Sequence, residues 1–449
     1  MFIERSSARL RTVRTLFVLL GLLPCAGLCG WAAIRHSAAH RRTVESRCEQ
    51  VIGLPVRIGR VEHVRPDAVR LHDCGLATAD GGVLVAAAAV DVESSSTEVR
   101  VSVGRVECTP RLARAVTALV QQWLSQPARF ERDCVVEVGE LCWQGSTSSD
   151  RQAADRRTGL RIECVAAADG GRAVRISGGA GDGARTDELR VLATVADAAG
   201  DLVGPAALRL EVTGAVSVPL PVAILEACLG CEPGGLALGA DAVVSGRIAS
   251  VREAGGWSGT ADGLVERIDL AVASAALTHR MSGDATVAIE RIEWSRSRIA
   301  GCDCRLVATR GMVDQGFLDA LVSTLGCRPG PEYRTATADR PRAFDEVACR
   351  LRLGPAGLDI RADRAAGPAI AVVRGGTILE EPAAAVPLER AAWLFSPPSA
   401  LVVPASQASR WLMGAFSDDV LSAGEGFRGR DSSRTPAEQA GRPARRNDF

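Results

Sequence analysis

The 449-residue sequence contains no lysine, so all 53 of its basic residues are arginines. This absence excludes chemistry that needs a lysine amine, including the Walker-type phosphate loop, Schiff-base catalysis and serine–lysine dyads. The 53 acidic residues bring the formal net charge to zero, and no internal segment accumulates one sign of charge. No electrostatic surface for nucleic acid is expected, and no nucleic-acid partner is predicted.

Histidine is scarce as well. The five histidines show no HxH or HExxH spacing, the arrangements that bring two imidazoles to one metal. They are His36, His40, His63, His72 and His279. No metal ligand, cofactor or catalytic residue is predicted, and the chain is not expected to be an enzyme.

Two glycine-containing segments resemble catalytic or cofactor motifs only loosely. Gly179-Ala180-Gly181-Asp182-Gly183-Ala184 matches a permissive dinucleotide fingerprint. Strand-like alternation follows it at residues 189–195 where a helix N-terminus is needed, so a hairpin loop is predicted instead. Gly256-Trp257-Ser258-Gly259-Thr260 lacks the last glycine of a nucleophile elbow and is interpreted as a turn.

Aromatic residues make up only 4% of a chain that is 47% hydrophobic, and 46 glycines and 21 prolines supply turns. This mix is typical of many short strands. Val99, Val101 and Val103 alternate with residues that point away from them, and Val287 and Ile289 do so in a later segment. The predicted fold class is therefore mainly β with short helices.

The first long apolar run lies at residues 15–34, which carry no charge and would span roughly 30 Å as a helix. We expect a retained transmembrane helix with residues 1–14 in the cytoplasm, because the downstream region has the pattern of an exported domain. Cleavage as a signal peptide after Gly30-Trp31-Ala32 is the alternative. Lipoprotein processing is disfavoured, since Cys25 and Cys29 follow proline and leucine where a small residue is needed.

Residues 36–416 are expected to form one extracytoplasmic β-rich body, and the polar residues 417–449 a disordered tail. A juxtamembrane helix is predicted at residues 36–52, ending at Gly53 before Pro55. Two later helices end with the same LGCxPG pattern, which predicts a C-terminal glycine cap and leaves open whether the pattern marks an internal repeat. The short helices are expected at residues 111–124, 222–229, 315–325 and 388–395.

Twelve of the 14 cysteines lie outside the apolar run. Two readings remain open: disulfides in an oxidising compartment, or small buried thiols. Cys228-x-x-Cys231 lies near a helix C-terminus, where the dipole disfavours a reactive thiolate. Cys302 and Cys304 should share one strand face, but no second pair completes a zinc site, so core packing is the preferred interpretation.

The run Ile52-Gly53-Leu54-Pro55-Val56-Arg57-Ile58, followed by Ala68-Val69-Arg70-Leu71-His72-Asp73-Cys74-Gly75-Leu76 and Asp80-Gly81-Gly82-Val83-Leu84, resembles the start of AsmA-like proteins. A second patch is similar to their C-terminal region. It consists of Ala343-Phe344-Asp345-Glu346-Val347, Gly357-Leu358-Asp359-Ile360 and Gly375-Gly376-Thr377-Ile378. Both patterns consist of common strand and turn residues, and together they bracket most of the chain.

The resemblance implies an elongated, curved antiparallel sheet that forms a groove, anchored in the inner (cytoplasmic) membrane with its body in the periplasm. It also implies a role in envelope lipid homeostasis, with phospholipid and other envelope proteins as partners. The leading hypothesis is that acyl chains lie against Val99, Val101, Val103, Val287 and Ile289. The alternative is a structural or interaction module that binds another envelope protein through a sheet edge and carries no lipid.

Overall fold

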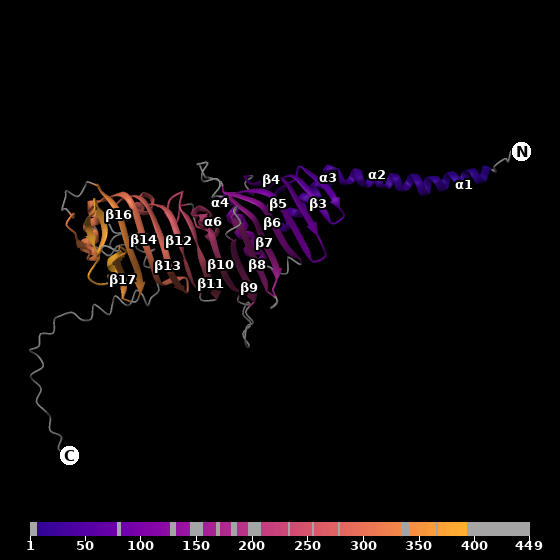
Figure 1. Ribbon diagram of the computed structural model, residues 1–449. Helices are drawn as coiled ribbons and strands as arrows, with labels where there is room; N and C mark the ends of the chain where they lie inside the picture. The colour runs from indigo at the N-terminus through magenta and orange to yellow at the C-terminus, as the bar shows by residue number, and fades with distance from the viewer. Residues whose placement is uncertain are drawn as a thin grey trace, which may run out of the picture. The chain divides into compact units, whose positions relative to one another are not determined.

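The computed structural model (Figure 1) describes the chain from residue 7 to residue 392 with gaps. The described ranges are 7–78, 82–125, 132–143, 156–167, 171–180, 186–195, 208–231, 234–253, 256–276, 279–333, 341–354, 356–364 and 367–392. The tail predicted at 417–449, the Asp80-Gly81 part of the family resemblance and the loop predicted at 179–184 lie wholly or partly outside these ranges. The chain divides into two compact units, Met1–Thr186 and Asp187–Phe449.

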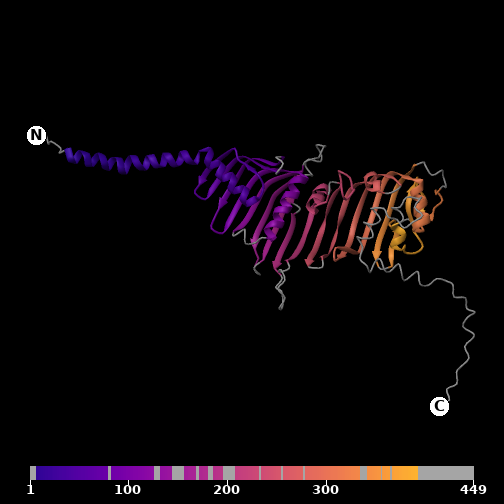
Figure 2. The same cartoon turned by 180° about the vertical axis from the view of Figure 1, so that it is seen from behind.

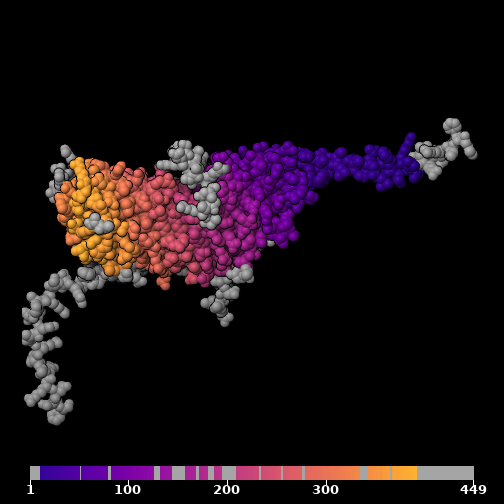
Figure 3. All heavy atoms as spheres, viewed as in Figure 1, coloured from indigo at the N-terminus to yellow at the C-terminus, as the bar shows by residue number. Residues whose placement is uncertain are grey.

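A long N-terminal helix precedes the sheet of the first unit. It consists of α1 (Ser7–Phe17), a π-helical turn η1 (Val18–Leu22) and α2 (Leu23–Arg35). The π turn lies just before Pro24, whose ring lacks an N–H and would meet the carbonyl four residues earlier in a regular α-helix. The stretch Arg11–Arg35 is long and apolar enough to cross a membrane, and the space-filling view shows it as a bare rod (Figure 3).

The sheet of the first unit begins after the helix α3 (Ala38–Ile52), which ends at Gly53 in the left-handed conformation as predicted. From β2 to β8 each strand pairs with the next one in the sequence, and β1 pairs with β3. The elements are β1 (Val56–Arg57), β2 (Arg60–Arg65), β3 (Ala68–Ala77), β4 (Val83–Ser94), β5 (Glu98–Cys108), α4 (Pro110–Ser125), β6 (Asp133–Trp143), β7 (Arg156–Ala166) and β8 (Arg172–Ala180).

One pair departs from the expected antiparallel sheet: β5 and β6 run parallel. Helix α4 returns the chain to the end of the sheet at which β5 begins, so that β6 runs in the same direction as β5. Helix α4 contacts both β4 and β8 and so crosses the strands between them (Figure 2). Its side chains Leu112, Ala113 and Leu124 are buried.

The second unit is an antiparallel meander from β9 to β14 that continues through β16, β17 and the β18–β19 hairpin. Its strands are β9 (Thr186–Val195), β10 (Leu208–Pro221), β11 (Val243–Glu253), β12 (Gly256–Asp269), β13 (Met281–Ser295), β14 (Arg298–Asp314), β15 (Arg328–Pro329), β16 (Pro341–Gly354), β17 (Gly357–Ala362), β18 (Ala369–Val373) and β19 (Gly376–Glu380). Its helices are α6 (Val222–Leu229), α7 (Leu270–Ala273), the 3-10 turn η3 (Ser274–Ala276), α8 (Gln315–Leu325) and α9 (Leu388–Ala392).

The turn predicted at residues 256–260 is wrong, because this segment is the first part of β12. Gly256 lies opposite Glu253 of β11, and Gly259 lies opposite Trp294 of β13. The predicted glycine caps of α6 and α8 are confirmed: Gly230 and Gly326 adopt φ angles of 73° and 71°. Such angles favour glycine, which has no Cβ to clash with the following carbonyl.

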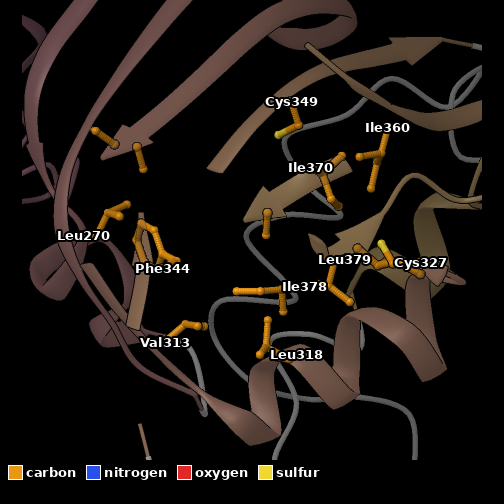
Figure 4. Close-up of a cluster of buried hydrophobic side chains, with 14 of the residues drawn as sticks. Leu270, Val313, Leu318, Cys327, Phe344, Cys349, Ile360, Ile370, Ile378 and Leu379 are labelled. Atoms are coloured by element: carbon orange, nitrogen blue, oxygen red, sulfur yellow. The ribbon is translucent and has the colours of Figure 1, made fainter. Parts of the chain in front are cut away.

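The largest buried cluster lies in the second unit, where α8 and the β18–β19 hairpin pack against the sheet (Figure 4). Phe344 of β16 and Leu318 of α8 are each 2% exposed, and Ile378 of β19 is fully buried. Val313, at the end of β14, leads directly into α8 and lies in the same cluster. The end of the second unit is therefore closed by a helix and a hairpin that share one core.

Two facing glycines allow a close approach of strands in the second unit. Gly246 of β11 and Gly263 of β12 are directly opposite each other. A Cβ on Gly246 would overlap the carbonyl oxygen of Asp262, and one on Gly263 would overlap that of Ser245. A side chain at either position would force these two paired strands apart.

We predict that Gly263→Ala destabilises the second unit by about 2–3 kcal/mol, because the added methyl group must push the two backbones apart. The matched control is Gly354→Ala in β16, where a Cβ meets nothing within 4 Å, and a change within about 0.5 kcal/mol is expected. Urea unfolding of both variants measures the difference. Equal destabilisation by the two substitutions would contradict the close approach.

Candidate functional site

One face of the first sheet is charged. A row of direct cross-strand partners runs from β2 to β8 on this face, and its charges alternate in sign over much of its length. Its members are Glu62, Arg70, Asp91, Ser102, Glu137, Arg161 and Ser177. Arg70 Nε lies 2.7 Å from Asp91 Oδ1, and Arg161 Nη1 lies 2.8 Å from Glu137 Oε1. The Arg70 hydrogen bond lowers the pKa of Asp91.

The opposite face, called here the apolar face of the first unit, is formed by three further rows of partners. The first contains His63, Val69, Val92, Val101, Val136, Ile162 and Ile176. The second contains Val61, Leu71, Val90, Val103, Val138 and Leu160. The third contains Val99, Cys134, Cys164 and Val174. Val99, Val101 and Val103 thus share one face, as the sequence predicts, and all three are half-buried.

Helix α3 covers the start of this apolar face. Its residues Val44, Cys48 and Ile52 form a stripe at four-residue spacing and pack against the buried side chains of β1, β2 and β3. Burial raises the pKa of the Cys48 thiol, and that of the neighbouring Cys74 to about 11. Both thiols are therefore protonated and act as apolar packing groups here.

The second unit carries a corresponding apolar face from β11 to β17. One row contains Val244, Val265, Val287, Leu306, Cys349 and Ala362. The next contains Gly246, Gly263, Ile289, Cys304, Leu351 and Ile360. A third contains Ile248, Ala261, Ile292, Cys302, Leu353 and Leu358. The predicted partners Val287 and Ile289 lie in adjacent rows, half-buried, at the margin of the large buried cluster.

The other face of this sheet is again charged. Asp303 of β14 accepts hydrogen bonds from Arg350 at 2.7 Å and from Arg352 at 3.0 Å. These bonds, that from Arg350 foremost, lower the pKa of Asp303. Arg305 and Arg350 face each other across β14 and β16, and Arg305 also pairs with Asp363 at 2.8 Å. Carboxylates thus separate arginines that would otherwise repel one another.

An apolar cavity of about 60 Å³ lies where α8 meets β16, β18 and β19 (Figure 4). Its lining includes Phe317, Leu321, Val347 and Ile370. Half-buried side chains on the apolar face of the second unit, such as Val287 and Ile289, offer further apolar surface outside this cavity.

Two sheet edges are covered by the chain itself. At β1, the backbone N–H groups of Val56 and Ile58 donate to Glu49 at 3.1 Å and to Glu45 at 2.9 Å, both on α3. At β17, Leu358 exchanges two backbone hydrogen bonds of 2.7 Å with Val386. A covered edge cannot accept a strand from another protein without first losing these partners.

A pair of histidines joins α3 to β2, close to the covered edge at β1. His40 Nε2 lies 3.0 Å from His63 Nε2, so one ring donates its N–H to the other. Burial lowers the pKa of His63, and the positive groups Arg35, His40 and His36 lower it further. Sequence spacing missed this pair because 23 residues separate its members; the detectable signal is that four of the five histidines fall within residues 36–72.

The remaining candidates from the sequence are metal-ligand clusters and the closely spaced cysteines. Among the described residues, no group of three or more His, Cys, Asp or Glu side chains is arranged to hold a metal ion. Cys302 and Cys304 do share one face, and their sulfurs interact with each other. Cys228 lies in the last turn of α6. Cys134, Cys164, Cys302 and Cys304 are thiols in the structure.

No protein-family model, curated protein or solved structure matches this chain. The function is therefore inferred from the two faces of the sheet, its covered edges and the N-terminal helix.

We predict that acid weakens the contact between α3 and the sheet. The docked state holds His63 with a lowered pKa, so it binds fewer protons than the undocked state. The stabilisation is complete above the ordinary histidine pKa of about 6.5 and is lost as the pH falls through the lowered value. As the pH is lowered from 7.5 to 5, hydrogen exchange of the Val56 and Ile58 amides, corrected for the intrinsic pH dependence, should become faster.

The variant His63→Gln cannot titrate, and its exchange should lose most of this pH dependence. His279→Gln in the second unit is the matched control and should behave like the parent protein. Identical pH profiles for the parent and His63→Gln would show that the histidine pair does not control docking.

Proposed function

We propose that this chain is an AsmA-like protein of the inner membrane that binds the acyl chains of phospholipids in the periplasm. The observation that carries the proposal is the pair of apolar faces, on which half-buried side chains such as Val103 and Val287 lie directly beside fully buried ones such as Val138 and Val265. Half-buried apolar side chains leave surface for a ligand, and each methylene group that leaves water contributes about 0.8 kcal/mol. An acyl chain lying along such rows would bury both partners.

The N-terminal helix supports the membrane anchor at residues 15–34. Large apolar side chains cover this helix without any partner in the described chain, and Leu20 is 71% and Leu28 65% exposed. At its end the Arg35 guanidinium lies 4.3 Å from the ring centroid of Trp31. Tryptophan and arginine are favoured at the boundary between hydrocarbon and water, so this pair fits a membrane interface.

Curvature of the sheet into a groove is the further part of the proposal. Strands twist in one direction, and glycines placed where strands approach closely permit additional bending. Gly246 and Gly263 provide such a position in the second unit. The charged face, with its arginine–carboxylate pairs, suits the solvent side of a groove, and the apolar face suits the lipid side.

The competing proposal, an interaction module that adds a strand at a sheet edge, has less support. The edge at β1 is satisfied by Glu45 and Glu49, and that at β17 by Val386. Other envelope proteins remain candidate partners through surfaces other than these edges.

We predict that Val101→Asp and Ile289→Asp abolish co-purification of lipid while the protein stays folded. In the groove proposal each new carboxylate remains near water but interrupts the apolar path. Mass spectrometry of lipids extracted from the purified protein, together with thermal unfolding, tests both statements. In a closed core the same carboxylates would be buried without a partner, and unfolding would follow from a cost of several kcal/mol.

Matched controls lie one residue away on the charged face. Arg100→Ser and Glu290→Ser replace half-buried and exposed side chains whose ion pairs contribute at most about 1 kcal/mol. Both controls should keep lipid and stability. A folded Val101→Asp protein that retains its lipid would defeat the groove, and unfolding of both aspartate variants would favour the scaffold alternative.

The topology has its own test. A reporter that is active only outside the cytoplasm, fused after residue 395, should give a signal, because residues 15–34 anchor the chain and the region after them has the pattern of an exported domain. The same fusion to a chain lacking residues 1–34 should be inactive. A cytoplasmic signal from the full-length fusion would contradict the periplasmic placement.

A further inference from the structure

Two cysteines of the first unit face each other across neighbouring strands. Cys134 of β6 and Cys164 of β7 are direct partners in the antiparallel register, and both point to the apolar face. Directly opposed residues in antiparallel strands have Cα atoms about 4.5–5.5 Å apart. A disulfide needs a Cα separation of about 4.4–6.8 Å, so this pair can be bridged without moving the backbone.

The surroundings isolate this pair from other reactions. Val99 and Val174 flank it in the same row, and Cys164 is only 2% exposed. Burial raises the pKa of both thiols, that of Cys134 to about 11, whereas the Arg172 guanidinium beside Cys164 partly opposes the shift there. The Arg172 guanidinium therefore favours the thiolate of Cys164.

We propose that Cys134 and Cys164 form a cross-strand disulfide in the mature protein. The inference rests on the periplasmic placement in the proposed function, since only an oxidising compartment provides the oxidant. The oxidant is the disulfide of a thiol–disulfide oxidase. The Cys164 thiolate attacks that disulfide, forms a mixed disulfide and releases one oxidase thiolate. The Cys134 thiolate then attacks the Cys164 sulfur, so that the oxidase leaves as a dithiol with two electrons and the two cysteines lose two protons.

Other cysteines lack this geometry. Cys142, on the same strand as Cys134, lies opposite Arg156 and has no thiol across from it. Cys302 and Cys304 are two residues apart on one strand, so they are not cross-strand partners. The pair at Cys134 and Cys164 is the one for which the described strand register places two thiols face to face.

The test uses the full-length protein, extracted from membranes and alkylated with N-ethylmaleimide in denaturant before digestion without reductant. Combined trypsin and glutamate-specific cleavage separates a peptide of residues 133–137, carrying Cys134 alone, from residues 164–172, carrying Cys164 alone. Mass spectrometry should find these two peptides linked and two hydrogens lighter than their sum. After reduction, the linked species should disappear and both peptides should accept the alkylating reagent.

Two variants sharpen the result. Cys134→Ser should leave Cys164 fully alkylated, whereas Cys142→Ser should retain the linked peptides. Reductant should lower the unfolding temperature of the parent protein but not that of a Cys134→Ser/Cys164→Ser double variant. Alkylation of both cysteines in a chain whose reporter is periplasmic would overturn the disulfide and leave the proposed function standing. Alkylation combined with a cytoplasmic reporter would overturn both.

Discussion

The alternation of apolar residues with charged or small polar ones along strands such as β3, β5, β7 and β16 is the constraint on which both units depend. Direct register keeps the alternation in phase, so that valine meets valine and arginine meets carboxylate from one strand to the next. A slip of one residue in any pair would bring arginines onto the apolar face and leave carboxylates without partners. The ion pairs of the charged face therefore contribute less as bonds than as a restriction on register.

Much of the fold follows from local signals. The helices at residues 222–229 and 315–325 have the predicted bounds because a glycine cap is a property of the residues at the helix end. The strands containing Val99 and Val287 were predictable for a similar reason, since side chains on a strand alternate regardless of what it pairs with. The shared face of Val287 and Ile289 is a local property of this kind.

Other features depend on contacts between residues far apart in the sequence, and local sequence patterns do not predict such contacts. The direction of β6 depends on where α4 delivers the chain, and no alternation in β6 itself encodes it. The segment that begins at Gly256 was predicted as a turn because it contains turn-forming residues. It is a strand because pairing with β11 and β13 outweighs their local preference. The contact between His40 and His63 likewise exists only after α3 has folded back onto β2.

The way α3 is fastened to the sheet has a mechanical consequence. Helix α2 ends at Arg35, and Ser37 caps the N-terminus of α3 two residues later. Glu49 and Glu45 of α3 then accept hydrogen bonds from the backbone N–H groups of Val56 and Ile58, at the start of the sheet. The uncharged residues 15–34 measure about 30 Å as a helix, which matches the thickness of a hydrocarbon core. In the proposed topology, only His36 and Ser37 lie between the anchor helix and α3. A tilt of the anchor in the bilayer is then passed on to α3 and not absorbed by a linker.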